Sequence, residues 1–153
     1  MTTQEYLSMP DELHKKIVSD VRKLESYKDL ASSISSPQFG EKVQGTHSTD
    51  APFVHYLSKI DALEKEISVE KQKLEELKVT IDAQIDLLDS EKEQCVLRYR
   101  YLMFMRMSRI AAEMHYSKRR VQQIHAAALK NFERFHRSEE RRVGKECRKR
   151  GGG

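Results

Sequence analysis

The first third of the chain carries apolar residues at spacings of three and four, which is the period of an amphipathic helix. These positions run from Leu13 to Ala31. Pro10, followed by two acidic residues, fits the first turn of a helix, where proline needs no N–H partner and carboxylates face the positive end of the helix dipole. We therefore predict an amphipathic helix within residues 1–34, starting at Pro10 and preceded by a short helical turn over residues 3–9.

A polar stretch follows and then a much longer periodic pattern. Residues 35–52 are rich in Gly, Ser and Thr and contain Pro37, which predicts a flexible linker. Beyond it, nine of eleven heptad a and d positions are apolar, the exceptions being Glu70 and Gln84. This predicts a long coiled-coil helix over residues 53–89. The positions are Phe53, Tyr56, Ile60, Leu63, Ile67, Glu70, Leu74, Leu77, Ile81, Gln84 and Leu88.

The partner of this long helix is left open by the pattern. It is either the first helix, folded back through the linker, or the same helix of a second subunit. We favour a folded-back hairpin that also forms a homodimer through residues 53–89. Asp82, Asp86 and Asp89 recur on one side of the helix, and we interpret them as a solvated acidic face.

The last third predicts shorter helices. Ser90 with Glu93 fits a capping box, so a helix is expected from Glu91 to about Leu102. Ser108 is the expected cap of the next helix, and the loop before it, residues 103–107, lacks a glycine. The following segment predicts two helices joined by a tight turn at His115 and Tyr116, with Ser117 as the cap of the second helix. The apolar positions of the two helices are Ile110, Ala111, Met114, Val121, Ile124, Ala128, Leu129 and Phe132.

This pair of helices has the pattern of a helix-turn-helix, in which small Ala111 lets the helices approach closely. The first turns of its second helix carry side chains suited to reading base edges, because Lys and Arg donate to guanine and Gln pairs with adenine. These are Lys118, Arg119, Gln122 and Gln123. The candidate phosphate contacts are Lys92, Arg100, Arg106, Arg109 and Arg120. A solvated basic face without a ligand is the alternative interpretation.

Residues Glu91–Phe132 resemble the promoter-reading C-terminal domain of bacterial sigma factors, called region four. The resemblance rests on Val96-Leu97-Arg98-Tyr99-Arg100-Tyr101 and, ungapped from Met107 onward, on Ile110-Ala111, Tyr116-Ser117, Arg120-Val121, Gln123-Ile124, Ala126, Ala128-Leu129 and Phe132. With its coiled-coil-like first half, the chain is similar to the sigma-like ArpU/RinA-type late activators of Gram-positive phages and prophages. The resemblance implies sequence-specific activation of phage genes and contact with RNA polymerase.

Charge is divided unevenly along the chain. The formal net charge of +4 is carried entirely by residues 137–153, while residues 1–90 hold 11 basic against 17 acidic side chains and residues 91–136 hold 10 against 4. A basic head on an acidic arm is the pattern of a double-stranded DNA reader. Residues 137–147 resemble a translated sequencing adapter, so we expect residues 137–153 to be a non-native or disordered tail. A native basic tail that adds non-specific DNA affinity is the alternative.

Other chemistry is not indicated. The six histidines lack zinc-ligand spacing, there is no phosphate loop or nucleophile elbow, and we predict neither metal, cofactor nor enzymatic activity. Two cysteines make no disulfide framework, and Cys95 is expected to be partly buried. Without a membrane span or signal pattern, the chain is expected in the cytoplasm of a bacterial host. The alternatives to an all-α transcription regulator are a phage terminase small subunit and a helical protein-interaction module without DNA binding.

Overall fold

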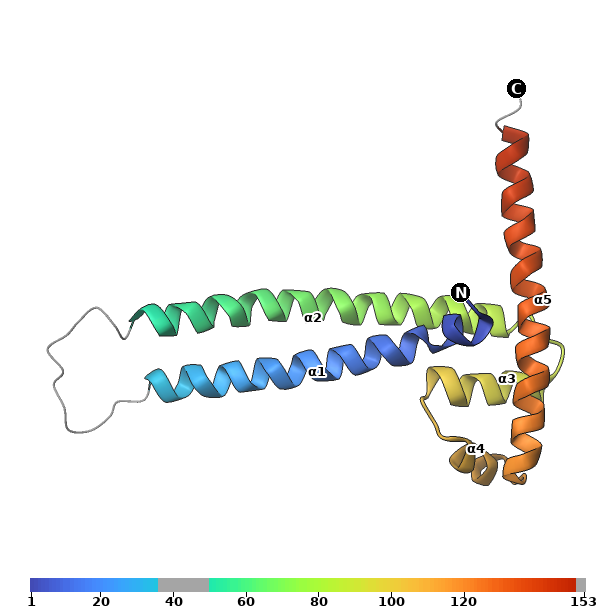
Figure 1. The fold of residues 1–153 in the computed structure, drawn as a ribbon, viewed down its shortest axis with the longest axis horizontal. Helices are drawn as coiled ribbons and strands as arrows, with labels where there is room; N and C mark the ends of the chain where they lie inside the picture. Colours follow the sequence, from blue (N-terminus) through green and yellow to red (C-terminus); the bar gives the residue numbers. More distant parts are fainter. Residues whose placement is uncertain (36–49, 151–153) are drawn as a thin grey trace, which may run out of the picture. The chain divides into compact units, whose positions relative to one another are not determined.

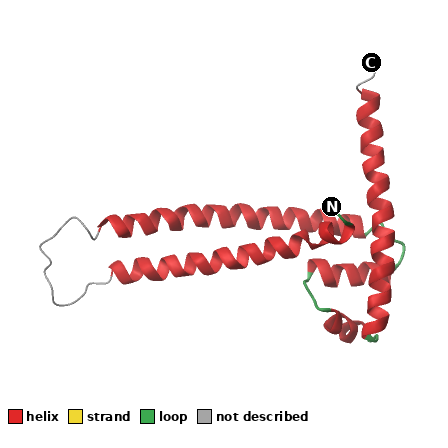
Figure 2. Cartoon of the chain, viewed as in Figure 1, coloured by secondary structure: helices red, strands yellow, loops and turns green. Residues whose placement is uncertain are grey.

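The computed structural model describes residues 1–35 and 50–150, and all regular structure in those ranges is helical, which confirms the all-α prediction (Figure 2). The elements are α1 (Thr3–Ser35), α2 (Asp50–Ile85), α3 (Glu91–Leu97), the π-helical turn η1 (Arg98–Leu102), α4 (Met107–Met114) and α5 (Lys118–Arg150). Figure 1 labels the five α-helices. The linker predicted over residues 35–52 lies mostly outside the described residues. None of the described helices has an apolar stretch long enough to cross a bilayer.

The chain forms two compact units that do not follow the predicted domain boundaries. One unit is Leu13–Glu75, and the other combines Met1–Glu12 with Glu76–Gly153. Both α1 and α2 therefore contribute residues to both units. The predicted division at residues 34, 53 and 90 separates segments that share a core.

The Leu13–Glu75 unit is an antiparallel helical hairpin. Lys16 on α1 lies 3.0 Å from Glu70 on α2, whereas Lys28, farther along α1, lies 3.2 Å from Glu64. The predicted apolar stripes face each other across it, with Ile17, Ala31, Leu63, Ile67 and Leu74 buried. The long helix therefore pairs with the first helix of the same chain.

Helix α1 begins at Thr3, earlier than predicted, because Thr2 and Glu5 form a capping box that was not predicted from the sequence. The Thr2 N–H donates to Oε2 of Glu5 at 2.8 Å, and the Glu5 N–H donates to Oγ1 of Thr2 at 3.2 Å. Pro10 consequently lies inside α1 rather than at its start. An interior proline removes a backbone hydrogen bond, at a cost of about 3 kcal/mol. The Pro10 ring is fully buried, and this burial offsets part of that cost.

The core of the second unit combines residues from the start of α1, the end of α2 and the last third of the chain. Leu7 of α1 is fully buried together with Ile81 and Ile85 of α2, and they pack in one cluster with Leu97, Tyr101, Ala128 and Phe132. The Tyr6 hydroxyl also donates to Oε1 of Gln84 at 2.8 Å. A domain limited to residues 90–136 would lack this half of its core, so the predicted boundary is wrong on packing grounds.

The acidic residues near the end of α2 lie in solvent as the sequence suggested, with the side chains of Asp82 and Asp86 48% and 61% exposed and Asp89 exposed, but two of them also pair with Arg98. Nε of Arg98 donates to Oδ1 of Asp82 at 2.7 Å, and Nη2 of Arg98 donates to Oδ1 of Asp86. The hydrogen bond with Asp82, reinforced by Asp86, raises the pKa of Arg98 above its ordinary value. Helix α2 ends at Ile85, four residues before the predicted end, and Leu88 remains buried beyond it.

Three smaller expectations about the last third also need revision or refinement. The helix from Glu91 is α-helical only to Leu97 and continues as η1 to Leu102. Cys95 is exposed rather than partly buried. Helix α5 extends to Arg150, so residues 137–150 are helical rather than disordered, while their non-native origin stays a prediction.

Candidate nucleic-acid interface

The loop before α4 is held by backbone geometry that the sequence did not reveal. Phe104 adopts a positive φ of 59°, the conformation that a glycine would take at least cost. The Arg100 guanidinium donates from Nη1 to the Met105 carbonyl at 3.2 Å. Helix α4 then starts at Met107 with Arg106 as its N-cap residue and no side-chain cap. The predicted cap at Ser108 is therefore wrong, since Ser108 lies inside the first turn.

The turn between α4 and α5 occurs where the sequence places it. His115 takes a left-handed conformation with φ 58° and ψ 37°. The Tyr116 N–H donates to the Ala111 carbonyl at 3.0 Å and the His115 N–H to the Ala112 carbonyl at 3.4 Å, which is a Schellman arrangement. Ser117 caps α5 as predicted, because its Oγ accepts from the Arg120 N–H at 3.1 Å.

A glycine at the turn should stabilise the protein. His115→Gly removes the Cβ that disfavours positive φ, and we expect the free energy of unfolding to rise by about 0.5–1 kcal/mol. The measurement is chemical denaturation followed by circular dichroism. His115→Ala serves as the control, because it keeps a Cβ and removes only the imidazole. Equal stabilisation by both variants would show that the side chain, and not the backbone, is responsible.

The relative placement of α3, α4 and α5 is fixed by one apolar cluster. Val96 of α3, Ile110 and Ala111 of α4, and Val121 and Ile124 of α5 pack together and are all buried. Ala111 thus lies between the two later helices, as the sequence predicts for a small residue at a close approach. This packing fixes which side of α5 remains in solvent.

The four candidate base-reading residues share that solvent side. All of them lie in the first two turns of α5, opposite buried Val121 and Ile124, and all are exposed: Lys118, Arg119, Gln122 and Gln123. Their long polar side chains project from a helix whose other face is occupied by the core. The structure therefore brings together the residues that the sequence singled out for this role.

The five candidate phosphate contacts divide into two groups. Arg106, Arg109 and Arg120 are exposed around the turn and the start of α4. Lys92 of α3 is exposed as well, and its Nζ lies 5.5 Å from the centre of the Tyr116 ring, within cation–π range. Arg100 differs from these, because it is half-buried and donates to the loop carbonyl of Met105.

A polar contact between Tyr101 of η1 and His125 of α5 connects these two elements. The Tyr101 hydroxyl lies 2.7 Å from Nε2 of His125, and the two rings stack with centroids 5.6 Å apart. Burial, reinforced by the charge of Arg100, lowers the pKa of His125 below its ordinary value. Burial raises the pKa of Tyr101. His125 was not singled out in the sequence, whereas Tyr101 belongs to the run on which the resemblance to region four rests.

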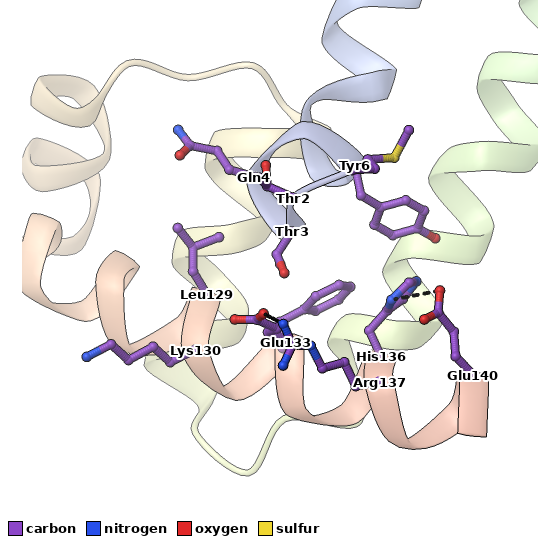
Figure 3. Close-up of a pocket in the computed structure, with 12 residues that line it drawn as sticks. Thr2, Thr3, Gln4, Tyr6, Leu129, Lys130, Glu133, His136, Arg137 and Glu140 are labelled. Atoms are coloured by element: carbon purple, nitrogen blue, oxygen red, sulfur yellow. Dashed lines mark ion pairs between the residues drawn. The ribbon is translucent and has the colours of Figure 1, made fainter. Parts of the chain in front are cut away.

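A hollow of about 770 Å³ lies between the first residues of the chain and the middle of α5 (Figure 3). Two ion pairs bridge its α5 wall, Glu133–Arg137 at 2.7 Å and His136–Glu140 at 3.7 Å. The His136 ring also lies 4.8 Å from that of Tyr6. Because Glu133 and Arg137 neutralise each other along this wall, we take the exposed first half of α5, and not the hollow, as the candidate site.

No protein-family model, curated protein or solved structure matches this chain.

Proposed function

We propose that this chain is a sequence-specific DNA-binding regulator that activates transcription of phage or prophage genes. In this proposal α4 and α5 are a helix-turn-helix, and α5 is the recognition helix that enters the major groove. The observation that carries the proposal is the two-sided first half of α5. Its apolar side packs on α3 and α4, while Lys118, Arg119, Gln122 and Gln123 are exposed on the other.

The chemistry of these side chains suits base edges. Lysine and arginine donate to the O6 and N7 acceptors of guanine, and glutamine pairs with the N6 and N7 groups of adenine. A helix with its side chains fits the width of the major groove. The proposed site therefore reads both purines from one helix face.

The surrounding charges suit a phosphate backbone. Residues 91–136 hold 10 basic and 4 acidic side chains, and Arg106, Arg109 and Arg120 are exposed beside the proposed reading face. Phosphate contacts of this kind position a protein on the duplex without reading its sequence. The hydrogen bond that Arg100 makes to Met105 favours a role in holding the loop, so we assign Arg100 to the loop and keep the other four as phosphate contacts.

The resemblance to sigma region four extends the proposal to activation. It suggests RNA polymerase as the protein partner and the bacterial cytoplasm as the place of action. The acidic arm, with 11 basic against 17 acidic side chains in residues 1–90, would be repelled by DNA and remain available for protein contacts. A homodimer formed through the arm is part of this proposal.

The direct test is selection of binding sites from a random DNA library with the full-length chain. A regulator should enrich one sequence and bind it far more tightly than random competitor at moderate salt. Light scattering on the same sample gives the number of chains. A ring-sized oligomer selective for a packaging site would instead indicate a terminase small subunit, and no enrichment at all would leave a protein-interaction module.

The salt dependence of binding separates the two arginine groups. Arg109→Ala and Arg120→Ala should each weaken binding to all sequences and lower the slope of log K against log salt by about 1. Arg100→Ala should mainly lower the denaturation midpoint, because it releases the Met105 loop. Lys130→Ala, an exposed cation farther along α5, is the control and should change neither property. A slope unaffected by both Arg109 and Arg120 would contradict their assignment.

A further inference from the structure

A carboxylate occupies a seam position of the Leu13–Glu75 hairpin. Glu70 fills one of the heptad positions that face α1, and only 5% of its surface is exposed. Asp20 faces it from α1. Within the described part of the chain, three buried side-chain oxygens lack a hydrogen-bond partner: Oδ2 of Asp20 and both Oε1 and Oε2 of Glu70. Of these, Oε1 lies 3.0 Å from Nζ of Lys16, which leaves Oε2 and Oδ2 without any facing donor. Buried carboxylate oxygens normally have donors, so this pair requires a physical explanation.

The charges around Glu70 do not balance when all groups are ionised. Carboxylate oxygens of Asp20, Glu66 and Glu70 lie within 4.8 Å of one another. The facing cation is Lys16 of α1, whose Nζ lies 3.0 Å from Glu70 and 3.9 Å from Glu66. Three negative charges would then share one positive charge. Neighbouring like charges disfavour ionisation, and removal from water disfavours it further.

One proton resolves both problems. A protonated Glu70 can donate from Oε2 to Oδ2 of Asp20, which gives these two oxygens a partner and removes one negative charge, while Oε1 keeps its ion pair with Lys16. Burial and the hydrogen bond with Asp20 raise the pKa of Glu70, although Lys16 acts in the opposite direction. A metal ion is a poorer solution, because the Lys16 ammonium already lies beside both glutamates and Glu66 is largely exposed.

We propose that Asp20 and Glu70 share one proton across the α1–α2 seam, which makes the hairpin a proton-sensitive element that packs more tightly as the solution is acidified from neutral pH. The folded hairpin holds a proton that the unfolded chain releases. Stability from this source is therefore complete below the ordinary glutamate pKa and is lost as the pH rises through the higher folded-state value. The inference concerns the arm and is independent of DNA binding.

The first test is a carboxyl-carbon NMR titration of the full-length chain, with the Glu70 signal assigned through its own backbone. We expect the Glu70 midpoint to lie above the ordinary value of about 4.3 for glutamate. A midpoint at or below that value would overturn the proposal. This measurement uses the native sequence and does not depend on the folding of a variant.

The second test compares the melting temperature of Glu70→Gln with that of the native chain from roughly pH 4 to pH 8. Glutamine imitates the protonated form, so Glu70→Gln should melt about 2–4 °C higher at the alkaline end and equally at the acid end. Glu66→Gln is the matched control, since it removes a charge of the same cluster whose side chain is 56% exposed and screened by water, and it should change the pH dependence far less than Glu70→Gln. Comparing variants with the native chain at each pH cancels the titration of His125 in the other unit.

Two results of this comparison would reject the shared proton. A lower melting temperature for Glu70→Gln at every pH would mean that Glu70 acts as the anionic partner of Lys16. Stabilisation of the native chain, but not of Glu70→Gln, by millimolar Mg²⁺ or Ca²⁺ would identify a cation site instead.

Discussion

Replacing Gln122 and Gln123 together by alanine is expected to remove most of the preference for the selected DNA site. Each bidentate contact with a base contributes about 1–3 kcal/mol of discrimination, or about 5- to 150-fold in affinity. Binding to random DNA should fall much less, because it depends on the arginines around the turn. Both glutamines are exposed, so the denaturation midpoint should stay unchanged. Fluorescence anisotropy with specific and random duplexes measures the two affinities.

The control for this experiment is Gln4→Ala, which removes an exposed glutamine from α1. It should leave both affinities at their native values. If the double variant discriminates between the two duplexes as well as the native chain does, Gln122 and Gln123 do not read bases, and the proposed orientation of α5 in the groove is wrong.

Enlarging Ala111 should disrupt the proposed site from within. Ala111 is 6% exposed and packs in the cluster with Val121 and Ile124, so Ala111→Leu has no space for its added methyl groups. We expect a loss of about 1–3 kcal/mol in the free energy of unfolding. DNA binding should fall with it, because the cluster fixes the orientation of the exposed face of α5. Chemical denaturation and anisotropy on the same preparation measure both effects.

The matched control is Ala112→Leu, one residue farther along α4. Ala112 is exposed, so the same change in volume there should leave stability and binding nearly native. An Ala111→Leu variant with a native denaturation midpoint would show that α4 and α5 do not approach as closely as this packing requires.

Local features of the fold could be predicted because they depend on residues a few positions apart. The heptad stripe of α2, the cap at Ser117 and the left-handed turn at His115 all follow from spacing and side-chain type. The exposed face of α5 follows from the same periodicity, because placing Val121 and Ile124 in the core leaves the intervening positions in solvent. Even the missed start of α1 has a local signal, the Thr2–Glu5 capping box.

Contacts between distant residues were decided only by the tertiary structure. The Tyr6 hydrogen bond to Gln84 joins residues 78 positions apart, and no local sequence pattern predicts it. The ion pairs of Arg98 with Asp82 of α2 and with Asp86 just beyond it connect this exposed acidic face to η1, which its spacing alone did not predict.

The sequence by itself determined where the helices form and which side of each is apolar, because backbone periodicity and capping act over one or two turns. The tertiary structure decided which of those sides meet. It joined Tyr6 to Gln84, paired Arg98 with Asp82 and set Glu70 against Asp20. Each of these outcomes depends on a neighbour from another helix, and such neighbours exist only after the chain has packed.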